Sequence, residues 1–481
     1  MNIKFVLKIL GIIAIIEGVF LLPPTIYAYV MDDGAFKAFV ITEALAFGIG
    51  CALNLIFEGR EHISPKDGMA VVTFGWVLAS AIGALPLYLS EWVPTYIDAF
   101  FEIVSGFTTT GASVIPNIEE VAKSVVLWRS MTHWIGGMGI LVFTLSLLPR
   151  LGVGGFQMFK AESPGPVVGK IDPKMSDTAK RLYSIYIVIT LVLFGLLCLG
   201  GMSVFDSIIH TLGVVGTGGF SSKVASAGHF SGSYIPIVMS IFMIICGTNF
   251  TMHYYFYKGK FRQIIKDEEL RLFYGIIFAA VGLIAIDLFR SGVTPFKSFV
   301  DALFQVTSIA STSGFATVDY DLWPNFSKFI LLMLFLFGSC AGSTAGGLKI
   351  IRVLIMGKIM NREVKKVIHP KAMIPIKVNG KIINDEVTLG VAAFFGMYFA
   401  IAFLATLAVT FTGLDILSSF SSVVTMLSNV GPGFNLVGPT DNFAFFAPGY
   451  KVMFSALMLL GRLEFFTMIA LLAPKSIIKG A

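Results

Sequence analysis

The chain has 481 residues, of which 56% are hydrophobic and 13% charged, and its formal net charge is +6. Together with a mean hydropathy of +0.83, this composition excludes an ordinary soluble protein and is typical of one embedded in a bilayer. The basic residues are spread through connecting segments, which argues against a nucleic-acid partner. The four cysteines, Cys51, Cys198, Cys246 and Cys340, show no CxxC spacing, so no disulfide framework or zinc site is indicated.

Ten apolar stretches are each long enough to cross the roughly 30 Å of hydrocarbon in a bilayer. The first follows Lys4 and Lys8 but continues to about Val30 without a small-x-small cleavage site, so we expect a retained transmembrane helix and not a signal peptide. The predicted spans are 5–30, 36–57, 69–90, 124–148, 182–203, 233–257, 272–290, 327–356, 387–412 and 448–473.

The positions of the basic residues predict how these spans are oriented. Segments 58–66, 150–181, 258–271 and 352–381 hold most of the lysines and arginines, and the alternate connections hold few. Positive residues favour the cytoplasmic side of a membrane. We therefore expect these four segments, and the N-terminus, to be cytoplasmic.

Four shorter apolar segments lie between spans and resemble one another. They read DAFFEIVSGFTTTGAS (98–113), DSIIHTLGVVGTGGFS (206–221), DALFQVTSIASTSGFA (301–316) and DILSSFSSVVTMLSNVGPGF (415–434). In the first three, Asp98, Asp206 and Asp301 each stand thirteen residues before Gly111, Gly219 and Gly314, whereas Asp415 stands eighteen before Gly433. An aspartate at the head of a short helix caps its free amides, so each unit is predicted to be a span, a pore helix, an extended loop and a span.

The loops after these short helices have the composition of a cation-selective filter. Carbonyls can line an axis only if some residues take φ angles that glycine favours, and irregular backbone is tolerated in a membrane only where it is buried in protein or lines a water-filled path. The predicted filter residues are Thr108, Thr109, Thr110, Gly111, Gly216, Thr217, Gly218, Gly219, Ser311, Thr312, Ser313, Gly314, Val430, Gly431, Pro432 and Gly433.

Other polar residues interrupt the apolar sequence. The stretch 338–347 within the eighth span has glycines at 338, 342 and 346, a spacing that fits either close helix packing or an unwound segment. Arg462 lies within the last span and must face protein, water or a partner. Arg129 and His133 share a helix face and are expected to pack or to form an outer hydrogen bond, and Glu17 and Glu43 fall inside the two leading spans.

Motifs for catalysis do not occur: there is no HExxH, GxSxG or GxxxxGK[ST] sequence. The missing phosphate-binding loop predicts that this chain binds no nucleotide itself. A secondary transporter for an organic solute would predict two matching halves, but four matching quarters are found.

The chain resembles the TrkH/KtrB/HKT superfamily of K⁺ transporters over nearly its whole length. The resemblance is carried by TTTGAS (108–113), GTGGFS (216–221), STSGFATVD (311–319), SNVGPGF (428–434), GSCAGSTAGGLK (338–349) and LGRLEFF (460–466). The two spans before residue 66 favour the TrkH branch, and Asn435 departs from the small residue expected after GPGF.

The resemblance implies an all-α membrane protein of ten transmembrane helices around a central, K⁺-channel-like pore. The expected units are two leading helices (1–66) and four pore repeats (67–160, 161–265, 266–375 and 376–481). The glycines at 111, 219, 314 and 433 imply selective passage of K⁺ and Rb⁺ over Na⁺, with a K⁺ symporter coupled to H⁺ or Na⁺ as the alternative. An intramembrane gate is implied below the filter, formed by Gly338, Gly342, Ser343, Thr344, Gly346, Gly347 and Arg462.

The resemblance also implies a homodimer with one pore per protomer in a bacterial or archaeal plasma membrane. Family members are controlled by a cytoplasmic ring of TrkA-like nucleotide-binding subunits. Segments 150–181 and 352–386 are the expected docking surfaces for such a partner.

Overall fold

The computed structural model describes residues 2–57, 64–139, 175–463 and 465–472, and these residues are mostly helical. Within these ranges, six helical segments are long and apolar enough to cross a membrane. They are α1 (Ile3–Met31), α2 (Phe36–Ile56), α3 (Pro65–Gly83) together with α4 (Leu85–Leu89), α9 (Met175–Leu199), α14 (Glu268–Arg290) and α18 (Asp385–Thr410). They correspond to six of the predicted spans.

The other four predicted spans are not single continuous helices in the described residues. The span 233–257 is bent by 97° between α11 (Tyr234–Gly247) and α12 (Phe250–Tyr257). The span 327–356 comprises α16 (Asn325–Leu336), a non-helical stretch and the start of α17 (Ile350–Ile368). The last span contains α20 (Pro448–Leu463) and α21 (Phe465–Leu472), and position 464 between them lies outside the described residues. In the span 124–148, α6 (Lys123–Gly137) is described, while 140–148 lies outside the described residues.

Four short helices occupy the predicted half-span positions: α5 (Tyr96–Phe107), α10 (Val204–Gly216), α15 (Pro295–Ala310) and α19 (Ile416–Ser428). The prediction that an aspartate caps each one is correct only for Asp415, which accepts a hydrogen bond from the amide of Ser418. In α5 and α10 the caps are Thr95 and Ser203, whose hydroxyls accept from the amides of Asp98 and Asp206 and donate to their carboxylates. In each case the hydroxyl satisfies one free amide of the first turn, and the acid three residues later holds that hydroxyl in place.

Asp301 lies further inside its helix, because α15 begins at Pro295 with Thr294 as the cap residue. Proline is favoured in the first turn of a helix, since its missing N–H has no intrahelical partner there. The start of α15 is therefore set by this proline and not by the aspartate.

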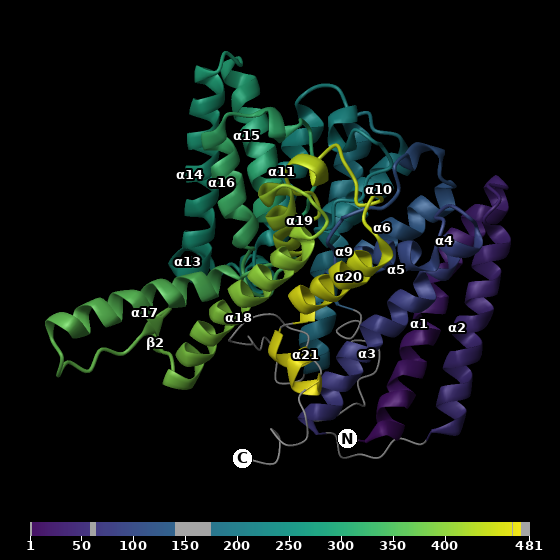
Figure 1. Ribbon diagram of the computed structural model, residues 1–481, viewed down its shortest axis with the longest axis horizontal. Helices are drawn as coiled ribbons and strands as arrows, with labels where there is room; N and C mark the ends of the chain where they lie inside the picture. The colour runs from purple at the N-terminus through teal and green to yellow at the C-terminus, as the bar shows by residue number, and fades with distance from the viewer. Residues whose placement is uncertain (1, 58–63, 140–174, 464, 473–481) are drawn as a thin grey trace.

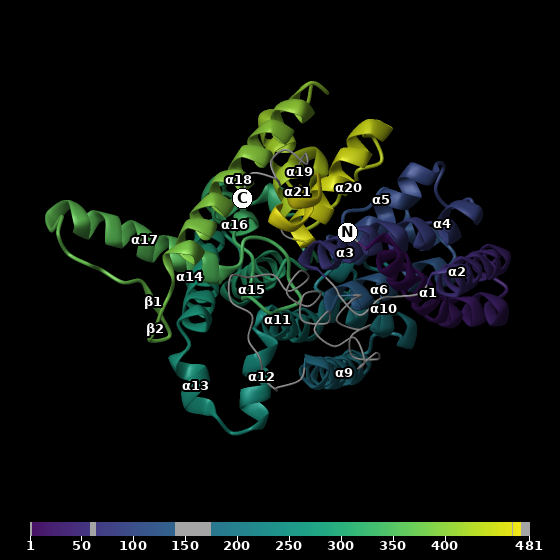
Figure 2. The same cartoon turned by 90° about the horizontal axis from the view of Figure 1, so that it is seen from below.

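The short helices surround the middle of the molecule when it is seen from below (Figure 2), and α1 and α2 lie at one edge. The leading pair contacts the rest of the protein through α3 and α6. At the opposite side, α17 projects away from the body (Figure 1), followed by a hairpin of β1 (Lys377–Val378) and β2 (Lys381–Ile382). The remaining described helix, α13 (Phe261–Lys266), joins α12 to α14.

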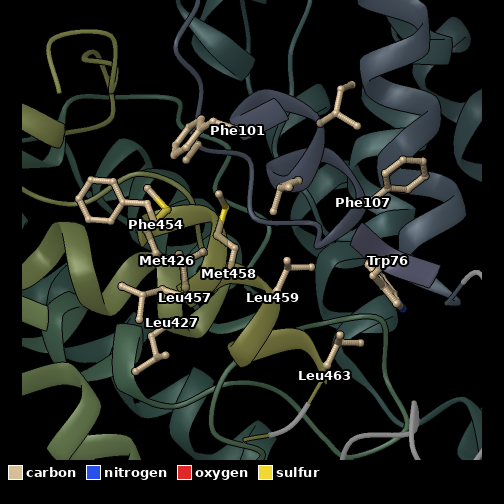
Figure 3. Packing of buried hydrophobic residues seen from close by; sticks show 14 of the residues in the cluster. Trp76, Phe101, Phe107, Met426, Leu427, Phe454, Leu457, Met458, Leu459 and Leu463 are labelled. Carbon is tan, nitrogen blue, oxygen red and sulfur yellow. The ribbon is translucent and has the colours of Figure 1, made fainter. Parts of the chain in front are cut away.

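The buried core joins the end of the chain to its beginning. Figure 3 shows Phe454, Leu457, Met458 and Leu459 of α20 among side chains of α5, α19 and α3. The contacts of α20 with both α5 and α19 place the last repeat beside the first. The four similar segments are therefore arranged in a closed circle, not in a row.

Candidate functional site: four loops around one axis

The loops that follow the four short helices share one backbone conformation. A left-handed residue that is not glycine ends each helix: Thr109 (φ 56°), Thr217 (φ 57°), Thr312 (φ 56°) and Asn429 (φ 55°). A glycine with positive φ follows two residues later in every loop: Gly111 (82°), Gly219 (82°), Gly314 (74°) and Gly431 (101°). Left-handed threonine is unfavourable by about 1–2 kcal/mol, so three repeats of the strain mark a conformation that the surrounding structure enforces.

Equivalent hydrogen bonds hold this conformation. The amides of Thr110, Gly218, Ser313 and Val430 donate to the carbonyls of Ser105, Gly213, Ser308 and Thr425, each five residues earlier. The left-handed residue before each of them donates to a carbonyl three residues earlier. These bonds satisfy carbonyls at the helix C-terminus, so the loop leaves the helix in the same direction each time.

The four loops contact one another in cyclic order through their glycines. A Cβ added to Gly111 would lie 2.1 Å from the carbonyl oxygen of Gly218, and one at Gly219 would lie 2.2 Å from that of Ser313. Likewise, one at Gly314 would lie 2.2 Å from the oxygen of Val430, and one at Gly431 would lie 2.5 Å from that of Thr110. Any side chain at these positions would displace a backbone carbonyl of the next loop, so only glycine permits the ring to close.

This ring corrects the register predicted for the fourth loop. The prediction aligned Gly433 with the glycines of the other loops, but Gly431 has the positive φ and the contact to the first loop. A Cβ at Gly433 would instead meet side chains of Val437 and Ser421 within its own repeat. The equivalent stretch is Ser428–Asn429–Val430–Gly431, because Asp415 is a cap residue while Asp98 and Asp206 lie three positions further along their helices.

A cavity of about 120 Å³ lies where the four glycines meet. Its lining includes all four of them, together with Arg129, Lys223 and Asp441 from the surrounding connections. Its wall is more polar than apolar. The cavity is polar and concave, and it adjoins the backbone of all four loops. It is therefore suited to hold water or a hydrated ion.

Buried side chains brace the first two loops from behind. The Glu102 carboxylate, fully buried, accepts from the Val114 amide (2.8 Å) and the Ser113 hydroxyl (3.0 Å), and it forms a salt bridge with Arg129. His133 Nδ1 bonds to the Gly106 carbonyl (2.7 Å), and the Phe220 amide donates to His133 Nε2 (3.2 Å). Arg129 and His133 thus connect α6 to two neighbouring loops, as the expected outer hydrogen bonds would require.

The predicted gate segment is unwound and lies directly against the ring. The backbone from Phe337 to Lys349 is not helical, and its two ends are joined where the Gly338 amide donates to the Leu348 carbonyl (2.7 Å). The Gly346 amide donates to Thr312 Oγ1 (2.8 Å), and the Thr217 hydroxyl donates to Thr344 Oγ1 (3.3 Å). Of the two alternatives left by the glycine spacing, the structure shows the unwound one, and we call residues 338–347 the intramembrane loop.

Arg462 binds this loop to a neighbouring helix end. Its guanidinium donates to the carbonyls of Thr344 (2.7 Å), Gly136 (2.6 Å) and Gly137 (2.9 Å), and the side chain is buried. Carbonyls at the C-terminus of α6 carry the partial negative charge of that helix. A buried cation thus lies beside the intramembrane loop.

Several functional candidates were missed by sequence reasoning. Lys451 and Asp98 form a buried ion pair between α20 and α5, 353 residues apart. Glu102, Glu269 and Lys349 are also buried. The sequence did offer one sign of these residues, because an ionisable residue in a membrane segment is by default a candidate for a functional role. In the two leading helices, Glu43 accepts from the Thr25 hydroxyl (2.5 Å), and Glu17 is buried.

Long apolar helices, together with four glycine loops closed around one axis, define a membrane transport protein. Residues 36–478 match the TrkH family, described as a cation transport protein. The chain is 37% identical over 482 residues to the Trk system potassium uptake protein TrkH of Escherichia coli K12, covering 98% of this chain and 99% of that protein. It is 33% identical over 480 residues to TrkG of the same organism, covering 98% of each.

A solved structure agrees with these sequence matches. The crystal structure of the potassium transporter TrkH from Vibrio parahaemolyticus has a TM-score of 0.89 to this fold at 34% identity, covering 99% of each chain. The chain therefore belongs to the TrkH family of cation transport proteins. This confirms the resemblance found in the motifs, and the family is one of transporters and not of enzymes.

Proposed function

We propose that the chain is a K⁺ uptake subunit that passes K⁺ and Rb⁺ selectively, in a channel-like manner, through a filter made by the four loops. The filter comprises residues 108–111, 216–219, 311–314 and 428–431. The observation that carries the proposal is the cyclic contact of each loop glycine with a carbonyl oxygen of the next loop. The proposal is also supported by the relatives that this chain resembles, which are potassium uptake proteins.

The mechanism follows from the chemistry of the loops. Backbone carbonyls replace water around a monovalent cation, and selectivity depends on how many oxygens the ion meets and how well they are held. The hydroxyl pairs Thr108–Thr110 and Ser311–Ser313, each 2.8 Å apart, tie side chains within two of the loops. The cavity above the ring supplies the ion, and the short helices direct their partially negative C-termini toward it.

The intramembrane loop and Arg462 form the gate in this proposal. The loop contacts the second, third and fourth filter loops, since a Cβ at Gly346 would also meet the Asn429 side chain at 2.7 Å. A segment in that position blocks the path below the filter when it is held there. Displacement of the loop, together with the Arg462 charge, opens the path.

The finer architecture belongs to the same proposal. We infer ten spans, with two leading helices (1–66) and pore repeats at 67–160, 161–265, 266–375 and 376–481. The protein would be a homodimer in a bacterial or archaeal inner membrane with its N-terminus in the cytoplasm. A TrkA-like nucleotide-binding partner would dock on 150–181, most of which lies outside the described residues, and on 352–386.

The test is cation flux through the purified protein in liposomes at fixed pH, with K⁺, Rb⁺, Na⁺ and Li⁺ gradients compared. K⁺ and Rb⁺ flux that needs neither a pH gradient nor Na⁺ is the expected result. Flux that requires a co-ion would replace the channel-like mechanism by K⁺ symport with H⁺ or Na⁺. If no cation moves even with the cytoplasmic partner added, the pore itself is refuted.

A further inference from the structure

One buried carboxylate bonds both the intramembrane loop and the helix that follows it. Glu269 lies in the first turn of α14, and its Oε1 accepts hydrogen bonds from the amide of Ala341 (2.6 Å) and the amide of Ile351 (3.1 Å). Ala341 is in the intramembrane loop, and Ile351 is in the first turn of α17, just after it. A single oxygen atom thus joins the loop to the start of α17.

The loop has polar contacts on its other side as well. Ser339 Oγ donates to the carbonyl of Ala310 at the end of α15 (2.8 Å), and the Cys340 amide donates to the Gly247 carbonyl (3.1 Å). The Phe250 amide donates to the Gly342 carbonyl (2.9 Å), so the loop also fills the bend between α11 and α12. Glu269 supplies the acceptor on the α14 side, toward the start of α17.

The position of Glu269 is itself fixed from the cytoplasmic side. The two residues before it in the chain, Asp267 and Glu268, accept from the side-chain and backbone nitrogens of Asn379 (2.7 and 2.8 Å) in the β1–β2 hairpin. Glu268 also forms a salt bridge with Lys358 of α17. The start of α14 therefore connects the cytoplasmic hairpin to the loop within three consecutive residues.

A buried amide that loses its hydrogen-bond acceptor has a large desolvation cost. Without the Glu269 carboxylate, the amides of Ala341 and Ile351 gain partners only if the chain moves toward water. The bonds therefore favour the position of the loop seen in the structure.

We propose that Glu269 is a positioning residue that keeps the intramembrane loop across the ion path by accepting hydrogen bonds from the loop itself and from the start of α17. This rests on the proposed function, because that function assigns the loop to the gate. The acceptor oxygen does the positioning, so a glutamine at this position retains the effect and an alanine does not.

The experiment uses the full chain in liposomes without a cytoplasmic partner, as wild type, Glu269→Ala, Glu269→Gln and Tyr274→Phe. The last is the matched control, since it removes the hydroxyl that bonds Thr248 (3.2 Å) from the same helix without touching the loop. Three quantities are measured: Rb⁺ flux, the K⁺ to Na⁺ flux ratio, and hydrogen exchange of the backbone amides of residues 338–351.

The Glu269→Ala protein is expected to show faster exchange across 338–351 and about tenfold higher Rb⁺ flux, the factor that ~1.4 kcal/mol of lost closed-state stability produces. Its K⁺ to Na⁺ ratio stays at the wild-type value, because the filter loops are unchanged. Glu269→Gln and Tyr274→Phe match the wild type in all three quantities. A loss of folding alone would not raise flux while leaving the flux ratio intact.

Exchange in Glu269→Ala at the wild-type rate would overturn the proposal, and so would faster exchange with unchanged flux. Faster exchange in Glu269→Gln would overturn the role of the acceptor oxygen. If the wild type carries no cation even after the cytoplasmic partner is added, the proposed function fails, and hydrogen exchange still decides whether Glu269 holds the loop.

Discussion

At the scale of single residues, the fourth loop offers a direct comparison between two glycines two positions apart. Gly431→Ser places a side chain against the Thr110 carbonyl at a positive φ, whereas the Cβ of Gly433→Ser would meet the side chains of Val437 and Ser421 in its own repeat. We expect the first variant to lower the K⁺ to Na⁺ permeability ratio about tenfold or more, since ~1.4 kcal/mol of lost coordination changes a ratio tenfold. Gly433→Ser is the control and keeps the ratio.

Ion flux with paired K⁺ and Na⁺ gradients measures this ratio. If Gly433→Ser lowers the K⁺ to Na⁺ ratio and Gly431→Ser does not, the filter glycine of the fourth loop is Gly433, as predicted from the sequence. Gly314→Ser, whose Cβ would press on the Val430 carbonyl, is expected to behave as Gly431→Ser does. Unchanged selectivity in both would refute the filter assignment.

Asp321 introduces a pH dependence outside the spans. Burial raises the pKa of its carboxyl to about 6, and the nearby Asp319 and Asp441 add to this, against the opposing hydrogen bond from the Asn435 amide. The folded protein therefore binds this proton more tightly than the unfolded chain, whose aspartate titrates near ~3.9. The contribution of Asp321 to stability falls as the pH rises from about 4 to about 6 and then stays constant.

Asp321→Asn keeps the acceptor for the Asn435 amide and removes the titration. We expect its thermal midpoint in detergent to exceed that of the wild type by a few degrees at pH 7 and to be equal at pH 4. Midpoints measured across this range give the difference at each pH. An equal difference at both ends would show that the charge of Asp321 does not affect folding.

At the scale of elements, the hairpin after α17 is fastened to α14 by its turn. Asn379 and Gly380 have φ angles of 50° and 77°, which a tight hairpin turn requires. Asn379 Oδ1 also accepts from the Glu268 amide (2.8 Å) at the start of α14. Asn379→Ala removes both contributions and should destabilise this attachment by about 1 kcal/mol.

Hydrogen exchange of residues 377–382 is the measurement for Asn379→Ala, and we expect faster exchange there than in the wild type. Lys381→Ala, on an exposed position of the same hairpin, is the control. Equal exchange in the two variants would mean that strand pairing alone holds the hairpin.

The lengths of the apolar runs were enough to predict most helices. The features that they did not predict depend on contacts between residues far apart in the sequence. The spans and short helices follow from runs of apolar residues, and six spans agree closely with single helical segments. The bend after Gly247 was not predicted, because 233–257 was taken as one apolar span and the bend depends on hydrogen bonds with residues 340 and 342. The pairing of Lys451 with Asp98 depends on closure of the circle, which residue spacing does not encode.

For the candidate site as well, one part was predicted from the sequence and another part was not. Thr/Ser/Gly-rich ends of four similar segments pointed to the ring, because glycine is required where backbones approach closely. The shift from Gly433 to Gly431 was missed because the helix caps differ, with a hydroxyl in two repeats and a carboxylate in the fourth. A cap is identified by the geometry around it, and the residue type alone did not distinguish the cap position from the one three residues later.

At the scale of the whole molecule, the orientation in the membrane is open to a labelling test. Both described ends of the chain lie at the lower side of the molecule in Figure 1, beneath α3 and α21. After replacement of the four natural cysteines, a cysteine in place of Lys260 should react with a membrane-impermeant thiol reagent only from the cytoplasmic side. A cysteine in place of Asp441 should react only from the opposite side, and the reverse pattern would invert the predicted topology.

The order in which the ribosome makes the chain gives the ring a further property. Asn429 Nδ2 donates to Thr110 Oγ1 (3.0 Å) across 319 residues, and Gly431 meets the Thr110 carbonyl, so the last loop to be synthesised completes the circle. A nascent chain that lacks it holds three loops and has no closed conduit for ions. Under the proposed function, translation therefore completes the ion path only when the protein is almost finished.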